Sequence, residues 1–342
     1  MFGNNKSKAP RSENEVLVAK DLRKSYGPRE ALKGLSFSLQ AGRILGFLGP
    51  NGAGKTTAIR ILTTILAPDA GHFVVNGISS EQPEELRRKI GVLPESLGFH
   101  KQMTGLECLV FFGRLYGRSA AQARATGLEL LEEVGLDLRS KSLIGSYSRG
   151  MRQRLGIART LVNDPSVLFL DEPTLGLDPR GQQELLQLIE RIARERNVGV
   201  ILCSHDLPEV ESICDDVLIM NLGQVVASGT VAEVIGRGRS RQGGVTRGNG
   251  IRIQVPKQSV AEARQALMAV SSVMKVTFSG DDAGWLRVEF ADLTDGDAAE
   301  NAYLNNRILE ALIRADIPIL DFGVERNRLQ DVFLHLTKEA IA

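Results

Sequence analysis

Gly49-Pro50-Asn51-Gly52-Ala53-Gly54-Lys55-Thr56-Thr57 is the stretch that decides the fold, because it fits the pattern G-x-x-x-x-G-K-[ST]. An apolar run at Ile44–Leu48 predicts a buried strand before it, and the pattern of Ala58–Leu66 predicts a helix after it. Glycines let the backbone amides curl around an anion, and a helix N-terminus adds partial positive charge. We therefore predict a phosphate-binding loop in which Lys55 reaches the β- and γ-phosphates of a nucleotide and Thr56 ligates Mg²⁺.

Two further apolar runs, Val167–Leu170 and Val198–Cys203, predict buried strands of the same sheet. The first is followed by Asp171 and Glu172, and the second is followed closely by His205. In open α/β sheets, ligands bind at the carboxyl ends of the strands. An aspartate there can hold Mg²⁺, and the adjacent glutamate can accept a proton from an attacking water. The sequence thus predicts an α/β domain, with a mainly parallel sheet, that hydrolyses a nucleotide.

The composition is that of an ordinary globular protein and indicates two domains. The chain has 342 residues, of which 43% are hydrophobic and 24% charged, and domains average about 150 residues. Lysine plus arginine (42) nearly equals aspartate plus glutamate (41), so the overall charge points to neither a nucleic acid nor a membrane. The three cysteines form no CxxC pair, and no apolar run reaches the length of a membrane span. We predict a cytosolic protein with a disordered, polar tail over 1–13.

A change in composition at Gly236 divides the chain. Residues 236–250 are rich in glycine and arginine, which predicts a linker between a first domain over 14–235 and a second over 251–342. A tether for nucleic acid or anionic lipid is the alternative interpretation of this stretch. Beyond it, the patterns follow the order β-α-β-β-α-β-α, which predicts a small α+β domain of the ferredoxin-like type.

The first domain resembles the ATP-binding subunits of ABC transporters, over about 15–235 and with several motifs in the family's order. The resemblance implies a P-loop NTPase domain of the ABC type with a helical subdomain. It also implies that Tyr26 stacks on the adenine of ATP. The sequence YSRGM at 147–151 matches the family's signature, so Ser148 and Gly150 are expected to contact the γ-phosphate bound by a partner subunit.

Further residues match the family's catalytic set. Leu175–Asp178 resembles the D-loop at the interface of two subunits, and His205 matches the switch histidine that contacts the γ-phosphate. In the mechanism that the resemblance implies, Glu172 is the catalytic base, while His205 and Lys55 stabilise charge on the transferred phosphoryl group. The site would be complete only in a head-to-tail dimer with two ATP molecules at its interface. That dimer is a homodimer or a heterodimer with a related ATPase.

Two positions depart from the family's commonest form. The signature has Arg149 in YSRGM where LSGGQ is usual, which puts a cation near the nucleotide or the dimer interface. The Q-loop position is Glu95 in place of glutamine, and its carboxylate offers an oxygen to Mg²⁺ while adding negative charge. Both changes resemble an exporter-type subgroup similar to drug- and lipid-export subunits. Residues 324–334 resemble the V-x-R-x-x-L-x-D-V-F-L ending of daunorubicin-resistance-type ATPases, and we expect their helix to pack on its own small domain.

The resemblance implies an ATP-hydrolysing subunit on the cytoplasmic face of the membrane that powers the separate transmembrane permease of an exporter. One alternative is a mechanical or regulatory clamp on a membrane complex that transports nothing. Another is a soluble ATPase switch acting on nucleic acid or the ribosome. The compact single cassette disfavours the last, so no nucleic-acid partner is expected.

The apolar residues of one helical segment have two interpretations. We expect Leu109, Phe111, Phe112 and Tyr116 either to dock a cytoplasmic helix of the permease or to pack inside the helical subdomain. We expect the C-terminal domain to stabilise the dimer.

Overall fold

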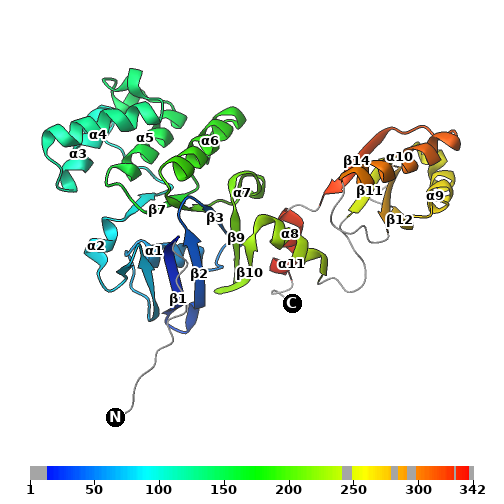
Figure 1. Ribbon diagram of the computed structural model, residues 1–342, viewed down its shortest axis with the longest axis horizontal. Helices are drawn as coiled ribbons and strands as arrows, with labels where there is room; N and C mark the ends of the chain where they lie inside the picture. Colours follow the sequence, from blue (N-terminus) through cyan, green and yellow to red (C-terminus); the bar gives the residue numbers. More distant parts are fainter. Residues whose placement is uncertain (1–13, 241–248, 279–283, 291–297, 327–328, 339–342) are drawn as a thin grey trace, which may run out of the picture. The chain divides into compact units, whose positions relative to one another are not determined.

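The computed structural model describes residues 14–240, 249–278, 284–290, 298–326 and 329–338. They form two compact units, the first comprising residues 14–231 and 333–338 and the second comprising 232–332. Figure 1 shows both units and labels many of their helices and strands. The predicted tail over 1–13 lies outside the described residues.

A six-stranded sheet forms the centre of the first unit, in the order β10-β9-β3-β8-β7-β6. Only β9 and β10 pair antiparallel; the other neighbours are parallel. The strands are β3 (Ile44–Leu48), β6 (Ile90–Leu93), β7 (Val167–Asp171), β8 (Gly199–Cys203), β9 (Asp216–Asn221) and β10 (Gln224–Thr230). The predicted strands at Ile44–Leu48 and Val167–Leu170 are confirmed. Both are buried on both faces, which explains why their sequences do not alternate.

A second, antiparallel sheet shares its core with the first. Its order is β2-β1-β4-β5, with β1 (Glu15–Tyr26), β2 (Arg29–Gln40), β4 (Ala70–Val75) and β5 (Ile78–Ser79). Helix α1 (Lys55–Leu62) contributes Ala58 and Ile61 to a cluster that also contains Phe73 of β4 and Phe169 of β7. The helix that begins at the phosphate loop is therefore held by apolar burial on both sheets.

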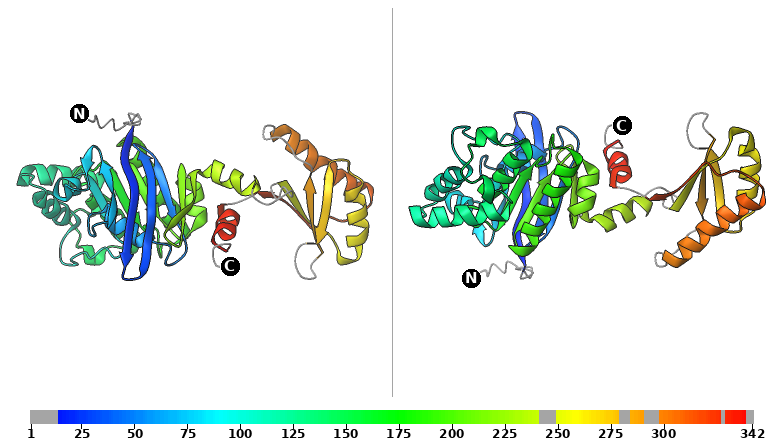
Figure 2. Two further views of the ribbon diagram at one scale, coloured as in Figure 1. Left: turned by 90° about the horizontal axis from the view of Figure 1, so that it is seen from below. Right: turned by 90° about the horizontal axis from the view of Figure 1, so that it is seen from above.

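The remaining helices of the first unit are α2 (Pro83–Arg87), α3 (Gly105–Leu115), α4 (Ala120–Glu133), α5 (Arg149–Leu161), α6 (Pro179–Glu195) and α7 (Leu207–Ile213), with 3-10 turns at Asp137–Arg139 and Ile144–Ser146. Figures 1 and 2 show α3 and α4 at the end of this unit away from β1 and β2. Gly117 separates α3 from α4, because it adopts a left-handed φ of 88° just after α3. Ser119 then caps α4 by accepting the Gln122 N–H at 3.3 Å.

The second unit has the predicted β-α-β-β-α-β order of a ferredoxin-like domain. Its elements are α8 (Val231–Ser240), β11 (Asn249–Gln254), a 3-10 turn (Lys257–Ser259), α9 (Val260–Met268), β12 (Val273–Phe278), β13 (Trp285–Phe290), α10 (Ala298–Arg314) and β14 (Asp321–Arg326). The sheet is antiparallel in the order β12-β13-β11-β14. Ala263 of α9 and Leu312 of α10 share one apolar core with Ile251 and Val288, so both helices cover the same face (Figure 2).

The predicted linker over 236–250 overlaps helix α8 at its start. The helix continues to Ser240, since arginine is a good helix former even in this glycine-rich stretch, and 241–248 lie outside the described residues. The last helix, α11 (Leu329–Lys338), follows β14. Within the described ranges, no helix is both long enough and apolar enough to cross a membrane.

Candidate active site

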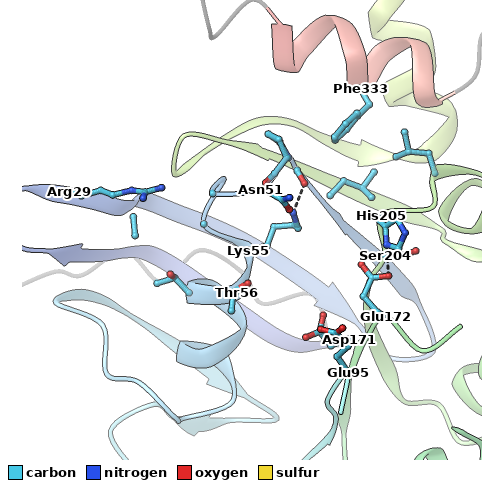
Figure 3. A pocket seen from close by; sticks show the side chains of 18 of the residues that line it. Arg29, Asn51, Lys55, Thr56, Glu95, Asp171, Glu172, Ser204, His205 and Phe333 are labelled. Carbon is cyan, nitrogen blue, oxygen red and sulfur yellow. Dashed lines mark hydrogen bonds and ion pairs between the residues drawn. The ribbon is translucent and has the colours of Figure 1, made fainter. Parts of the chain in front are cut away.

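A cavity of about 770 Å³ lies at the carboxyl ends of the parallel strands (Figure 3). Residues from elements far apart in the chain line it: the loop after β3, the turns after β6, β7 and β8, and the end of β1. The lining comprises Tyr26, Arg29, Ala31, Leu48, Gly49, Pro50, Asn51, Gly52, Gly54, Lys55, Thr56, Thr57, Glu95, Asp171, Glu172, Ser204, His205, Leu207 and Phe333. Most of the site residues predicted from the sequence therefore meet in one place.

The phosphate loop requires glycine where it enters α1. Gly54 has a φ of 106°, and a Cβ there would lie 2.6 Å from the carbonyl oxygen of Ala31. Lys55 folds back over its own loop and donates to the carbonyl oxygens of Gly49 and of Pro50, the latter at 3.2 Å. Burial lowers the pKa of Lys55, and the neighbouring carboxylates oppose this shift. The ammonium group is thus held at the mouth of the loop, where a phosphate would replace the carbonyl oxygens.

Asp171 and Glu95 lie side by side at the edge of the cavity (Figure 3). Burial raises the pKa of Asp171, and the charges of Glu172 and Glu95 raise it further, whereas Lys55 lowers it. A divalent cation would relieve this crowding of carboxylates. With the hydroxyl of Thr56 on the same cavity, the donors are all oxygens, as Mg²⁺ prefers, so the residues fit the predicted metal site.

This site differs from a cage built entirely of protein ligands. Across the described ranges, no three histidine, cysteine, aspartate or glutamate side chains are grouped to hold a metal ion. Mg²⁺ at a phosphate loop takes few protein ligands, because phosphate and water oxygens complete its shell.

Glu172 and His205 both line the cavity and form a hydrogen bond, with Oε2 of Glu172 2.8 Å from Nδ1 of His205. The hydrogen bond to Glu172 raises the pKa of His205, and the carboxylate charge adds to the effect. Glu172 has a left-handed φ of 48°, a conformation that costs a residue with a side chain about 1–2 kcal/mol. Its N–H donates to the carbonyl oxygen of Cys203 at 2.9 Å, which fixes this backbone against β8. Such strain is typical of functional positions held by their surroundings.

Four predicted site residues do not line this cavity in the described part of the chain. Ala53 lies buried within the loop. Ser148 and Gly150 are at the start of α5, where the Ser148 hydroxyl accepts the Met151 N–H at 3.2 Å as an N-cap. Asp178 is the N-cap residue of α6. One chain therefore brings the phosphate loop and the acidic residues together but leaves the signature residues elsewhere.

Six lining residues were not among the predicted site residues: Arg29, Ala31, Leu48, Ser204, Leu207 and Phe333. Ser204 and Leu207 are within two positions of His205, so their nearness to that histidine was an available clue. Arg29 begins β2, close in sequence to Tyr26. Phe333 offers no local clue, because it comes from the far end of the chain.

The terminal helix does not pack wholly on its own small domain as predicted. From Phe333 onward its residues belong to the first unit. The Asn221 side chain donates to the carbonyl oxygen of Thr337 at 3.3 Å, and both residues are buried. Figure 3 shows the Phe333 ring directed from α11 toward the cavity, on the side of Asn51 and His205. This buried hydrogen bond ties the end of α11 to β9 of the first unit.

Arg149, the cation in the unusual signature, covers a turn of its own chain. A Cβ on Gly176 would lie 2.6 Å from Cζ of Arg149, and Gly176 has a left-handed φ of 72°. The left-handed backbone favours glycine at position 176, and a side chain there would displace the guanidinium group. The signature and the turn at Leu175–Asp178 are thus in contact within one chain.

The apolar residues predicted to dock a permease separate into buried and exposed groups. Leu109 is fully buried, so its docking interpretation is wrong and core packing explains it. Phe112 is half-buried beneath the guanidinium of Arg159, 5.4 Å from its ring centre. Phe111 and Tyr116 are exposed and remain available to a partner.

The phosphate loop after a central parallel strand, together with the carboxylates at the end of β7, defines a P-loop nucleotide-hydrolysing protein. The family model described as ABC transporter matches residues 32–175. The linearmycin resistance ATP-binding protein LnrL of Bacillus subtilis (strain 168) is 33% identical, covering 94% of this chain and 98% of that protein. The daunorubicin/doxorubicin resistance ATP-binding protein DrrA of Streptomyces peucetius is 36% identical, covering 92% and 90% respectively.

Solved structures agree with these relatives. An ATP-binding subunit of an ABC transporter is 30% identical with a TM-score of 0.58, covering 65% of this chain and 92% of that one. CbiO1 from Clostridium perfringens, part of the ABC transporter complex CbiONQ, is 28% identical with a TM-score of 0.60, covering 67% and 96%. The chain belongs to the ABC transporter family, as one of its ATP-binding and ATP-hydrolysing subunits that serve a separate permease.

Proposed function

We propose that this chain powers the export of a drug-like compound through a separate transmembrane permease. The relatives named for linearmycin and for daunorubicin and doxorubicin resistance support this substrate class. Both match over more than nine-tenths of this chain, so the similarity includes the C-terminal part. The chain would act on the cytoplasmic face of the membrane, where ATP is available. Exposed Phe111 and Tyr116 would contact a cytoplasmic helix of the permease.

Residues of the cavity are assigned distinct roles toward ATP. Tyr26, which is half exposed on the cavity, would stack on the adenine. Lys55 and the loop amides would bind the phosphates. Thr56, Asp171 and Glu95 would hold Mg²⁺, which when bound screens the charge of the phosphate oxygens.

Glu172 and His205, which follow β7 and β8, would carry out hydrolysis. Glu172 would accept the proton of a water that attacks the γ-phosphorus, so that ADP leaves as the new phosphorus–oxygen bond forms. His205, whose pKa is raised by Glu172, would stay protonated more readily and stabilise charge on the transferred phosphoryl group. Lys55 would stabilise the same charge from the opposite side.

The observation that carries the proposal is the incomplete cavity. It contains the phosphate loop, the base and the histidine, whereas Ser148 and Gly150 lie at the start of α5 outside it. A second subunit in head-to-tail arrangement would bring its own α5 N-terminus to the γ-phosphate. We infer a homodimer with two ATP molecules between the subunits. Binding of ATP would close this dimer and hydrolysis would open it, which moves the attached permease.

Glu172→Gln provides the test, because it preserves the shape of the side chain while removing the base. The variant and the wild type are measured by size-exclusion chromatography with light scattering, with and without Mg-ATP. We expect the variant to become a stable dimer only with Mg-ATP, and its turnover to fall about 100-fold or more. Lys55→Ala should stay monomeric under both conditions. A Glu172→Gln variant that binds ATP and hydrolyses it at the wild-type rate would refute the assignment of the base.

A further inference from the structure

A buried carboxylate lies beneath the turn that carries His205. Glu209, on α7, is only 6% exposed, and its Oε2 accepts a hydrogen bond from the Ser204 hydroxyl at 3.0 Å. The same hydroxyl oxygen accepts the N–H of Asp206 at 3.0 Å. Ser204 and Asp206 are the two neighbours of His205 in the chain. These two bonds therefore fix the backbone on both sides of the histidine.

Glu209 also faces the turn that carries Glu172. Burial raises the pKa of Glu209, the hydroxyls of Thr174 and Ser204 lower it, and the charges of Asp206 and Glu172 raise it. Thr174 is buried and lies two residues after Glu172. The Glu209 carboxyl is thus placed between the turn after β7 and the turn after β8, although it does not line the ATP cavity itself.

We propose that Glu209 is a positioning residue for ATP hydrolysis, which acts through Ser204 to hold His205 against Glu172. The imidazole is itself mostly exposed, so packing around the ring does not fix its direction. Its direction depends on the backbone of the turn, which the Ser204–Glu209 hydrogen bond anchors to α7. This inference rests on the proposed function, because it assigns a role within the same hydrolytic site.

Four substitutions separate positioning from general stability. Ser204→Ala and Glu209→Leu remove the hydrogen bond between the turn and α7, whereas Glu209→Gln keeps an acceptor oxygen in the same place. The matched control is Ser212→Ala, whose hydroxyl donates to the carbonyl oxygen of Glu209 at 2.7 Å and does not involve the turn. Each variant is compared with the wild type in steady-state ATP hydrolysis, ATP binding and thermal unfolding.

We expect kcat to fall roughly 10-fold in Ser204→Ala and Glu209→Leu, because a small displacement of a catalytic group is costly. ATP affinity in these variants should stay within about twofold, since neither residue contributes to the phosphate loop. Glu209→Gln and Ser212→Ala should keep kcat within about twofold of the wild type. A folded Ser204→Ala variant with wild-type kcat would overturn the proposal, and Ser204→Ala decides alone if Glu209→Leu does not fold.

A second measurement distinguishes positioning from structural support. The chain has four histidines, so the ring of His205 can be followed by NMR and assigned by its loss in His205→Gln. The hydrogen bond to Glu172 raises the pKa of His205, so a loosened turn should lower that pKa in Ser204→Ala but not in Ser212→Ala. An unchanged His205 pKa in Ser204→Ala would overturn the proposal even if kcat fell. A wild type that does not hydrolyse ATP would instead defeat the proposed function, while the titration would still report on the turn.

Discussion

Gly46→Ala tests the close packing between the strand that leads into the phosphate loop and the helix beneath the His205 turn. Gly46 lies in the middle of β3, and a Cβ there would lie 2.5 Å from Cγ1 of Val210 on α7. It would also lie 3.2 Å from Sγ of Cys214 and 3.3 Å from Cγ1 of Val217. Two carbon atoms cannot remain 2.5 Å apart, so α7 or β3 would have to move.

The expected loss of stability follows from this overlap. Overpacking a core by a methyl group costs typically about 1–3 kcal/mol, and the stiff valine rotamer puts Gly46→Ala toward the upper part of that range. For a domain of roughly 200 residues, each kcal/mol lowers Tm by about 2–4 °C. We therefore expect Tm to fall by roughly 4–12 °C. In Gly46→Ala/Val210→Ala the overlapping methyl is gone, so the double variant should be more stable than the two single effects predict, by about 1 kcal/mol or more.

Thermal unfolding followed by circular dichroism, with urea denaturation as a second measure, provides the assay. Gly236→Ala is the matched control, because it adds the same methyl group on α8 with no heavy atom within 4 Å. Its effect should be neutral or stabilising by up to about 1 kcal/mol, since alanine favours a helix. Wild-type stability in Gly46→Ala would refute the packing argument. It would also be refuted if the stability losses of Gly46→Ala and Val210→Ala added up, within about 0.5 kcal/mol, to the loss in the double variant.

Phe333→Ala removes an aromatic ring from the cavity wall and should weaken ATP binding by roughly threefold to tenfold, whereas Leu334→Ala, 44% exposed on the same helix, should not. Equal affinities of the two variants in a fluorescence titration would contradict this role of Phe333. Glu172→Gln removes the carboxylate charge that raises the pKa of His205 and leaves a neutral acceptor in its place, so an NMR titration should show the ring losing its proton at lower pH than in the wild type. The stability that this pair contributes is complete below the ordinary histidine pKa of 6.5 and is lost as the pH rises through the raised folded pKa. The Tm difference between Glu172→Gln and wild type should therefore shrink above that pKa, and identical His205 titrations in both proteins would contradict the pairing.

The sequence by itself determined the parts of the molecule whose chemistry is local. The phosphate loop is a contiguous motif, and the strand before it is a continuous apolar run, so both can be read from neighbouring residues. The parallel sheet then places the ends of β7 and β8 beside that loop, which explains why Asp171, Glu172 and His205 line the same cavity. The division between α3 and α4 depends on Gly117, whose left-handed φ ends the first helix.

Only the tertiary structure decided which distant residues support or complete that cavity. Phe333 reaches it from α11, and Glu209 meets Ser204 across the turn, although neither residue stands in a pattern that specifies its neighbour. Arg149 lies over Gly176 and away from the cavity, a placement that the motif spacing does not contain. Periodicity and motifs describe residues close together along one element. The contacts of these side chains depend instead on how separate elements bury apolar surface and satisfy buried polar groups, which is fixed only when the whole chain has packed.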